Sequence, residues 1–133
     1  MQIKRAVAVV AIVTEQFKQQ MIAEFEEGIK QVDASIQALE SQSRRYLLQL
    51  QTADLAQANA FRRQVDAEKQ KQEGTKQELQ ARLQASQELT IGSEVERGNV
   101  ESYVEMQVGD NLIAKLTGAA IVVKDDVVVE IRG

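Results

Sequence analysis

The chain has no cysteine, histidine, proline or tryptophan among its 133 residues. Without cysteine and histidine it cannot form disulfides, zinc fingers, thiol nucleophiles or imidazole acid–base pairs. Aromatic residues make up 4% of the chain, so any globular core must be small. The net charge of −4 argues against general polyanion binding, although a local basic patch is compatible with it. With no glycine-rich phosphate loop and no EF-hand spacing, we expect no enzyme, no cofactor and no metal site.

The first residues combine two basic side chains, Lys4 and Arg5, with an apolar run that ends at Val13. This order superficially resembles a secretory signal, but no small-residue cleavage site follows it. The run is also far shorter than the ~20 residues that cross a membrane. We therefore expect residues 1–13 to form a buried β-strand of a cytoplasmic protein that does not associate with membranes.

Residues 14–90 have the pattern of a coiled coil. Thr14 is a suitable N-cap, and Glu15 lies in the first turn, where the helix dipole favours an acid. Apolar residues then recur in alternating steps of three and four, which is a heptad seam. They are Ile22, Phe25, Ile29, Val32, Ile36 and Leu39.

Beyond Leu50 the heptad register fails, and the next large apolar residue is Phe61. One continuous helix could absorb this break as a stutter, and a helical hairpin could also produce it. The region has no glycine or proline to mark a turn, which favours the continuous helix. However, Asp54 followed by Gln57 resembles the start of a second helix, and a fold there pairs Leu47 with Phe61. We predict the antiparallel hairpin, with its tip near residues 52–56.

In this hairpin, part of the apolar stripe has no apolar partner. Val32, Ile36 and Leu39 would face Lys76, Gln72 and Lys69, respectively. Either the lysine and glutamine stems cover the stripe, or the stripe is an interface. We predict a homo-oligomer or partner interface formed by Ile29, Val32, Ile36 and Leu39.

Two arginine pairs lie on either side of the predicted tip: Arg44 and Arg45, then Arg62 and Arg63. A hairpin would gather them into one ring, and guanidinium groups match phosphate and carboxylate groups well. The alternative is an ordinary solvated helix surface. The ring is a candidate anion or nucleic-acid contact, and it suggests a nucleic-acid- or ribosome-associated module as the second hypothesis.

Residues 91–133 contain short apolar runs separated by glycine and aspartate, which indicates β-strands. The runs are Val100–Val108, Ala119–Val123 and Val127–Ile131, with a short strand or helical turn at Leu112–Leu116. Neither end of the chain can bury a core alone, so both should join in one small sheet or barrel-like domain. We expect an α+β protein in which the coiled-coil hairpin is inserted into this domain.

Three C-terminal segments resemble a known family: Leu89–Val95, Val108–Asp110 and Ile121–Arg132. They are similar to the C-terminal part of the YlqD family, a group of small bacterial proteins with no assigned activity. The resemblance implies a bacterial, cytoplasmic protein and carries over no catalytic or binding residue. Together with the coiled coil, it leads us to expect a non-enzymatic structural module that oligomerises and binds an unknown protein partner.

Overall fold

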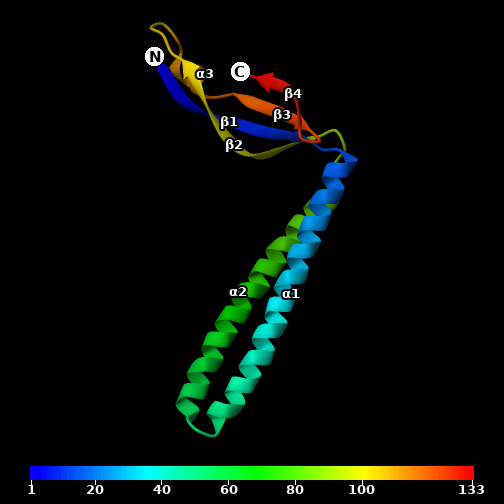
Figure 1. The fold of residues 1–133 in the computed structure, drawn as a ribbon, viewed down its shortest axis with the longest axis vertical. Helices are drawn as coiled ribbons and strands as arrows, with labels where there is room; N and C mark the ends of the chain where they lie inside the picture. Colours follow the sequence, from blue (N-terminus) through cyan, green and yellow to red (C-terminus); the bar gives the residue numbers. More distant parts are fainter. The chain divides into compact units, whose positions relative to one another are not determined.

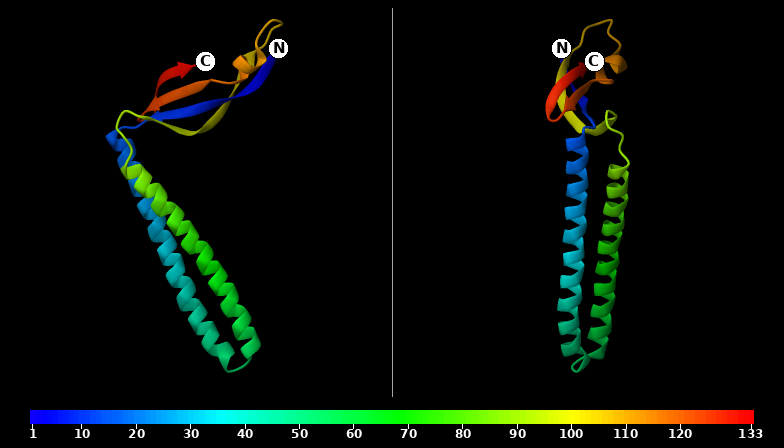
Figure 2. Two further views of the ribbon diagram at one scale, coloured as in Figure 1. Left: turned by 180° about the vertical axis from the view of Figure 1, so that it is seen from behind. Right: turned by 90° about the vertical axis from the view of Figure 1, so that its right-hand side faces the viewer.

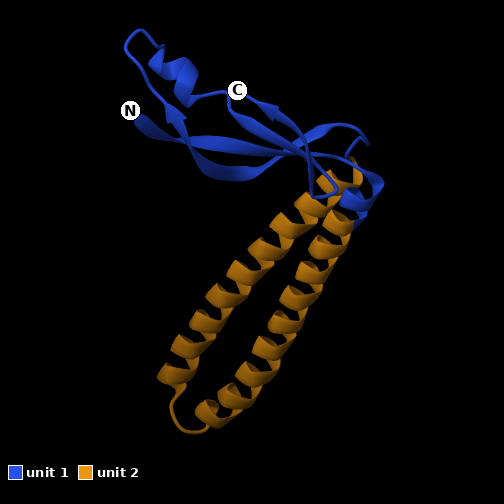
Figure 3. Cartoon of the chain, turned by 45° about the horizontal axis from the view of Figure 1, so that its top comes forward, with its two compact units in different colours: residues 1–19, 89–133 blue, residues 20–88 orange.

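The computed structural model describes residues 1–133, which divide into two compact units. One unit joins both ends of the chain, Met1–Gln19 and Leu89–Gly133, and the other is Gln20–Glu88 (Figure 3). The elements are β1 Gln2–Ile12, α1 Glu15–Gln51, α2 Leu55–Gln87, β2 Glu94–Glu105, α3 Leu112–Leu116, β3 Ala120–Lys124 and β4 Val127–Arg132 (Figure 1). The predicted α+β class, with a helical hairpin inserted between strands from both ends, is confirmed.

The sheet has four strands in the order β2-β1-β3-β4. β1 pairs antiparallel with β2 and parallel with β3, and β3 pairs antiparallel with β4. Because β2 and β4 are edge strands, the sheet is open rather than closed into a barrel. The apolar run at the N-terminus forms the centre of this sheet, where Val7 and Ala11 are buried. Its apolar, β-branched composition suits a strand that is flanked on both sides.

The second strand differs from the sequence-based prediction. β2 begins at Glu94 and ends at Glu105, whereas the apolar pattern predicted a strand over Val100–Val108. The segment before Val100 is polar, but it pairs with β1 as far as Ile12. An edge strand can carry such residues because one of its sides and much of its surface stay in water. The ambiguous run Leu112–Leu116 forms a short helix, capped by the side chain of Asn111.

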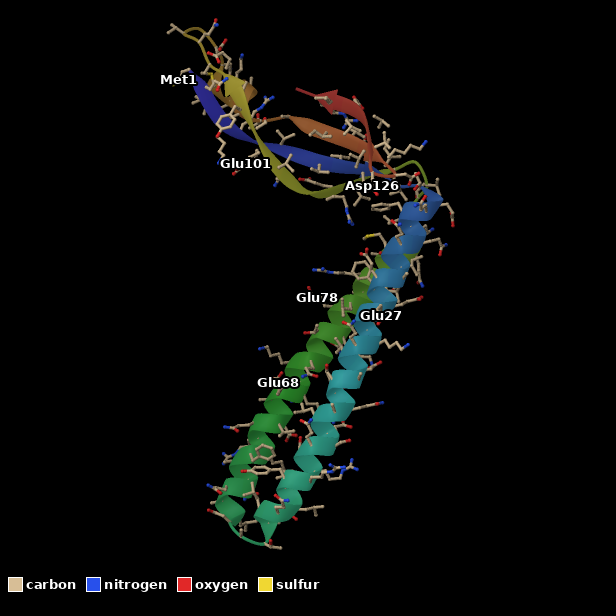
Figure 4. The ribbon with its side chains drawn as sticks, in the orientation of Figure 1. Met1, Glu27, Glu68, Glu78, Glu101 and Asp126 are labelled. Carbon is tan, nitrogen blue, oxygen red and sulfur yellow. The ribbon has the colours of Figure 1, made fainter.

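The predicted hairpin of the last two strands is confirmed. β3 and β4 are joined by Asp125 and Asp126, which have φ values of 48° and 67° (Figure 4 labels Asp126). Two successive positive φ values are the requirement of a type I′ turn, and aspartate tolerates them better than most residues do. The turn is also tied to the end of β1, because Thr14 Oγ1 donates a 2.6 Å hydrogen bond to Asp125 Oδ1.

The helical block folds back on itself as predicted, and α1 and α2 lie side by side in both views of Figure 2. The backbone N–H of Phe17 donates to Thr14 Oγ1 at 3.1 Å, which caps α1. At the tip, Gln57 N–H donates to Asp54 Oδ1 at 3.2 Å, which caps α2. The cap explains why the chain turns here without glycine or proline: it satisfies one of the free amides at the start of the second helix.

The register of the two helices lies within one residue of the predicted pairing. Phe61 meets Tyr46 rather than Leu47, with ring centroids 4.6 Å apart and planes at 70°. Nearer the other end of the hairpin, Leu79 lies against Gly28, and a Cβ placed on this glycine would be 3.4 Å from Leu79 Cδ1. The aromatic pair and this close approach therefore fix the hairpin at two levels.

Candidate functional site

The predicted interface stripe lies in the seam between α1 and α2. Ile36 is 7% exposed, and Ile29, Val32 and Leu39 are half-buried. The stripe was expected to lack cover within the chain, and the structure differs from that expectation at Ile36. The physical reason is that long polar side chains of α2 lie over it, as the alternative interpretation of the sequence proposed.

Two lysines of α2 cross the seam to acids of α1. Lys69 Nζ lies 2.6 Å from Glu40 Oε1, and Lys76 Nζ lies 2.7 Å from Asp33 Oδ1. The hydrogen bond from Lys69 holds the pKa of Glu40 below its usual value and raises the pKa of Lys69. The hydrogen bond to Asp33 likewise raises the pKa of Lys76. The two ion pairs therefore lie about one helical turn before and after Ile36, the buried member of the stripe.

A groove opens in the middle of the hairpin, and Val32 of the stripe is one of the residues that line it. It has a volume of about 440 Å³ and is lined by Gly28, Gln31, Val32, Ser35, Gln72, Thr75 and Leu79. The groove exists because small side chains, Gly28, Ser35 and Thr75, occupy both helices at the same level. Sequence reasoning missed it, since small residues in a heptad pattern give no signal until the register of the two helices is known.

Gln72, which lines the groove, has one polar atom without a hydrogen-bond partner. Its Nε2 donates to Glu68 Oε1 at 3.3 Å, but its Oε1 is buried and accepts no hydrogen bond. A buried acceptor without a donor costs about 1–3 kcal/mol of stability.

The four arginines of the second candidate site meet at one level of the hairpin. Arg45 precedes Tyr46 and Arg62 follows Phe61, so the aromatic contact brings both arginine pairs to the same height. All four side chains are exposed, and none forms an ion pair within the chain. Between Glu40 and Asp66 the only other charged residue is Asp54. The tip is therefore a cationic end on an otherwise acidic chain.

The sheet has its own ion pair, which sequence reasoning did not find. Arg132 of β4 makes two hydrogen bonds to Glu94 of β2, at 2.6 Å from Nη2 and 3.2 Å from Nη1. The hydrogen bond from Arg132 holds the pKa of Glu94 below its usual value, and hydrogen bonds to Glu94 and Glu130 raise that of Arg132. Both residues lie on edge strands and point to the same face of the sheet, according to the strand register. Val122, between them on that face, is 1% exposed.

The structure contains no group of three or more acidic side chains arranged to hold a metal ion. None of its helices is both long enough and apolar enough to span a membrane.

Comparison with known proteins gives matches over the full length of the chain. The uncharacterized protein YlqD of Bacillus subtilis (strain 168) is 28% identical over 132 residues, which cover 99% of this chain and 98% of that protein. A crystal structure of a protein of unknown function from Synechococcus sp. WH 8102 has the same fold, with a TM-score of 0.82 and 30% identity. The match covers 100% of this chain and 95% of the Synechococcus protein. Residues 1–132 match the family described as YlqD protein, and the chain therefore belongs to the YlqD family.

Proposed function

We propose that this chain is a non-enzymatic structural module of the bacterial cytoplasm that self-associates and binds a protein partner through its coiled coil. The observation that supports this function is the groove beside the stripe. There, a two-helix coiled coil leaves one edge of its apolar seam open, at Val32 and Leu79.

The shape and chemistry of the groove suit a third helix. A helix-in-groove complex needs an elongated depression with an apolar floor and a few polar groups that fix the register. Val32 and Leu79 supply the apolar floor, and the small side chains Ser35 and Thr75 let another backbone come close. Gln72 adds a polar side chain to the wall of the same groove. This helix comes from a second copy of the chain or from another protein.

The test changes the walls of the groove without opening the hairpin. Ser35 and Thr75 are exposed, so a double substitution Ser35→Arg and Thr75→Arg fills the groove from its rim. Substitutions within the stripe are less informative, because Ile36 is buried and a charged residue in its place would destabilise the hairpin itself. The matched control is Gln37→Arg with Gln70→Arg, which adds the same charge at exposed positions that do not line the groove.

We expect light scattering to give a lower mass for the groove variant than for the wild type and the control. Far-UV circular dichroism should show unchanged helix content in all three proteins. Equal masses for the groove variant and the wild type would exclude the groove as the self-association surface. A partner helix from another protein would then remain testable by titrating that protein against the same pair of variants.

The cationic tip supports a second candidate function, a nucleic-acid- or ribosome-associated module. Its supporting observation is that Arg44, Arg45, Arg62 and Arg63 have no ion pairs within the chain. Tyr46 is exposed beside them and could stack on an unpaired base.

This candidate predicts binding to single-stranded RNA that weakens steeply between 50 and about 200 mM salt, measured by fluorescence anisotropy. Replacement of the four arginines by glutamine should abolish the binding. The control removes the same charge from four exposed lysines elsewhere: Lys4, Lys30, Lys71 and Lys124. If both variants lose binding equally, the tip has no special role, and the absence of binding at low salt rejects the function.

A further inference from the structure

One row of residues on α1 passes through the groove and has opposite charges at its two ends. Gln31 and Ser35 line the groove. Residues three or four positions apart lie on one face of a helix, so steps of this size extend the row in both directions. Its members are Glu24, Glu27, Gln31, Ser35, Ala38, Gln42 and Arg45. The row therefore begins with two glutamates near the base of the hairpin, which is the end opposite the tip, and finishes with an arginine near the tip.

The charged ends of this row have no ion-pair partners within the chain. Glu24, Glu27 and Arg45 are exposed, and none of them forms a salt bridge. A rise of about 1.5 Å per residue places Glu27 and Arg45 about 27 Å apart along the helix. The residues between them in the row are uncharged. The two ends of one row are thus too far apart to pair with each other.

The second helix has the same order of charges across the groove. Thr75 lines the groove, and Lys71 and Glu78 lie one helical turn before and after it. Because α2 runs back from the tip, Lys71 lies on the tip side of the groove and Glu78 on the base side. Glu68 and Arg82, one further turn away, have hydrogen-bond partners on α2 itself. Both helices therefore place a basic residue on the tip side of the groove and an acidic residue on the base side.

We infer that two copies of the hairpin associate through the face that holds the groove, with their tips at opposite ends. This orientation rests on the self-association proposed above and adds to it the arrangement of the two copies. A two-fold axis across the hairpin at the level of Ser35 brings Arg45 of one copy level with Glu24 of the other. In α2, the midpoint between Lys71 and Glu78 lies within about two residues of the same level, so these residues also meet their opposites.

The order of charges is complementary to itself in the antiparallel pair but not in a parallel one. In a parallel pair, arginine would face arginine and glutamate would face glutamate, which is unfavourable. In the antiparallel pair each favourable contact occurs twice, because the two-fold axis repeats it. A different protein would have to carry the same charges in reverse order about 27 Å apart, whereas a second hairpin already has this arrangement. Between the charged ends, Ser35 and Ala38 are small, so the two copies can approach closely.

The first test uses the absence of cysteine from the chain. One further step along the row at each end gives Gln20 and Gln49, which the antiparallel pair brings to the same level. A mixture of Gln20→Cys chains and Gln49→Cys chains, treated with a short bismaleimide, should give cross-linked dimers on a denaturing gel. Each variant alone should stay uncross-linked. Cross-linking of each variant with itself, and not in the mixture, would show a parallel pair and overturn the inference.

The second test reverses the charges of one end at a time. Glu24→Lys with Glu27→Lys makes both ends basic, and Arg45→Glu with Lys71→Glu makes them acidic. Light scattering should give about half the wild-type mass for each double variant, and the wild-type mass for their equimolar mixture, in which opposite charges meet again. The control Glu26→Lys changes an exposed residue outside the row and should keep the wild-type mass.

The outcomes separate the orientation from the self-association itself. A wild type with the 14.8 kDa mass of one chain would overturn both. If the groove variant described above lowers the mass and the two charge-reversed variants keep the wild-type mass, the antiparallel arrangement is wrong while self-association through the groove stands. A mixture that does not regain the wild-type mass would also overturn the antiparallel arrangement.

Discussion

The two helices of the hairpin differ sharply where they face each other. In its middle, α1 presents Val32, Ile36 and Leu39, whereas α2 presents the polar residues Lys69 and Gln72 at the same level. A symmetric coiled coil would stabilise this segment by interdigitated apolar side chains. Here only one helix supplies them, and the other supplies flexible stems and charges. This difference indicates that contacts on either side of the middle set the register of the hairpin. Apolar packing between the two helices contributes less to stability in the middle.

The largest expected effect on stability comes from shortening the side chain of Ile36, which lies in the middle of α1. Ile36→Ala should lower the free energy of unfolding by about 3 kcal/mol. The substitution removes most of a buried side chain and leaves a cavity that the polar residues of α2 do not fill. Urea denaturation followed by circular dichroism measures the change. Leu48→Ala, at a residue that is 64% exposed, is the control and should change the stability by less than about 0.5 kcal/mol. A small effect of Ile36→Ala would mean that the seam contributes little to stability.

The second test makes α2 more like α1. Gln72→Leu removes a buried oxygen that has no hydrogen-bond donor and adds apolar surface beside Val32. We expect a gain of about 1–2 kcal/mol in the free energy of unfolding. A loss of stability would show that the glutamine amide is required within the chain.

The third test compares the two glycines of the hairpin. Gly74 of α2 has open space where an added Cβ would lie, so Gly74→Ala should stabilise the helix by about 1 kcal/mol. At Gly28 of α1 the new Cβ would lie 3.4 Å from Leu79, so Gly28→Ala should gain less. Thermal unfolding of both variants measures the difference. Equal gains would show that the helices can separate at Gly28 without cost.

The smallest effect concerns the ion pair of Glu40 with Lys69. The pKa of Glu40 is lowered from 4.5, so its contribution is present above pH 4.5 and is lost as the pH falls through the folded-state value. The pKa of Lys69 is raised from 10.5, so its contribution is present below pH 10.5 and is lost as the pH rises further. Unfolding midpoints of the wild type and Glu40→Gln should differ most between pH 4.5 and pH 10.5, and the difference should shrink outside this range. Glu27→Gln, at an exposed residue that forms no ion pair, should follow the wild type throughout.

Much of the architecture could be predicted because it depends on local chemistry. The cap at Asp54 and Gln57 located the tip, and the acidic pair Asp125 and Asp126 located the last turn. The first half of β2 could not be predicted, since Glu94 is in a strand only because β1 pairs with it.

The candidate site was less predictable because it depends on contacts between distant residues. A signal for the covered stripe was present: Asp33 and Glu40 have the same seven-residue spacing as Lys69 and Lys76. This equal spacing indicates ion pairs only once the antiparallel register of the two helices is known.

The position of β1 at the centre of the sheet has a consequence for the order of folding. This strand is synthesised first, yet both of its neighbours follow the hairpin in the chain. An unstructured loop from Val13 to Ser93, which share a 2.8 Å backbone hydrogen bond, would make their encounter entropically costly. A hairpin that forms early from local contacts shortens this loop to a few residues at each end. Early formation of the coiled coil would therefore lower the entropic cost of pairing β1 with the strands from the other end of the chain.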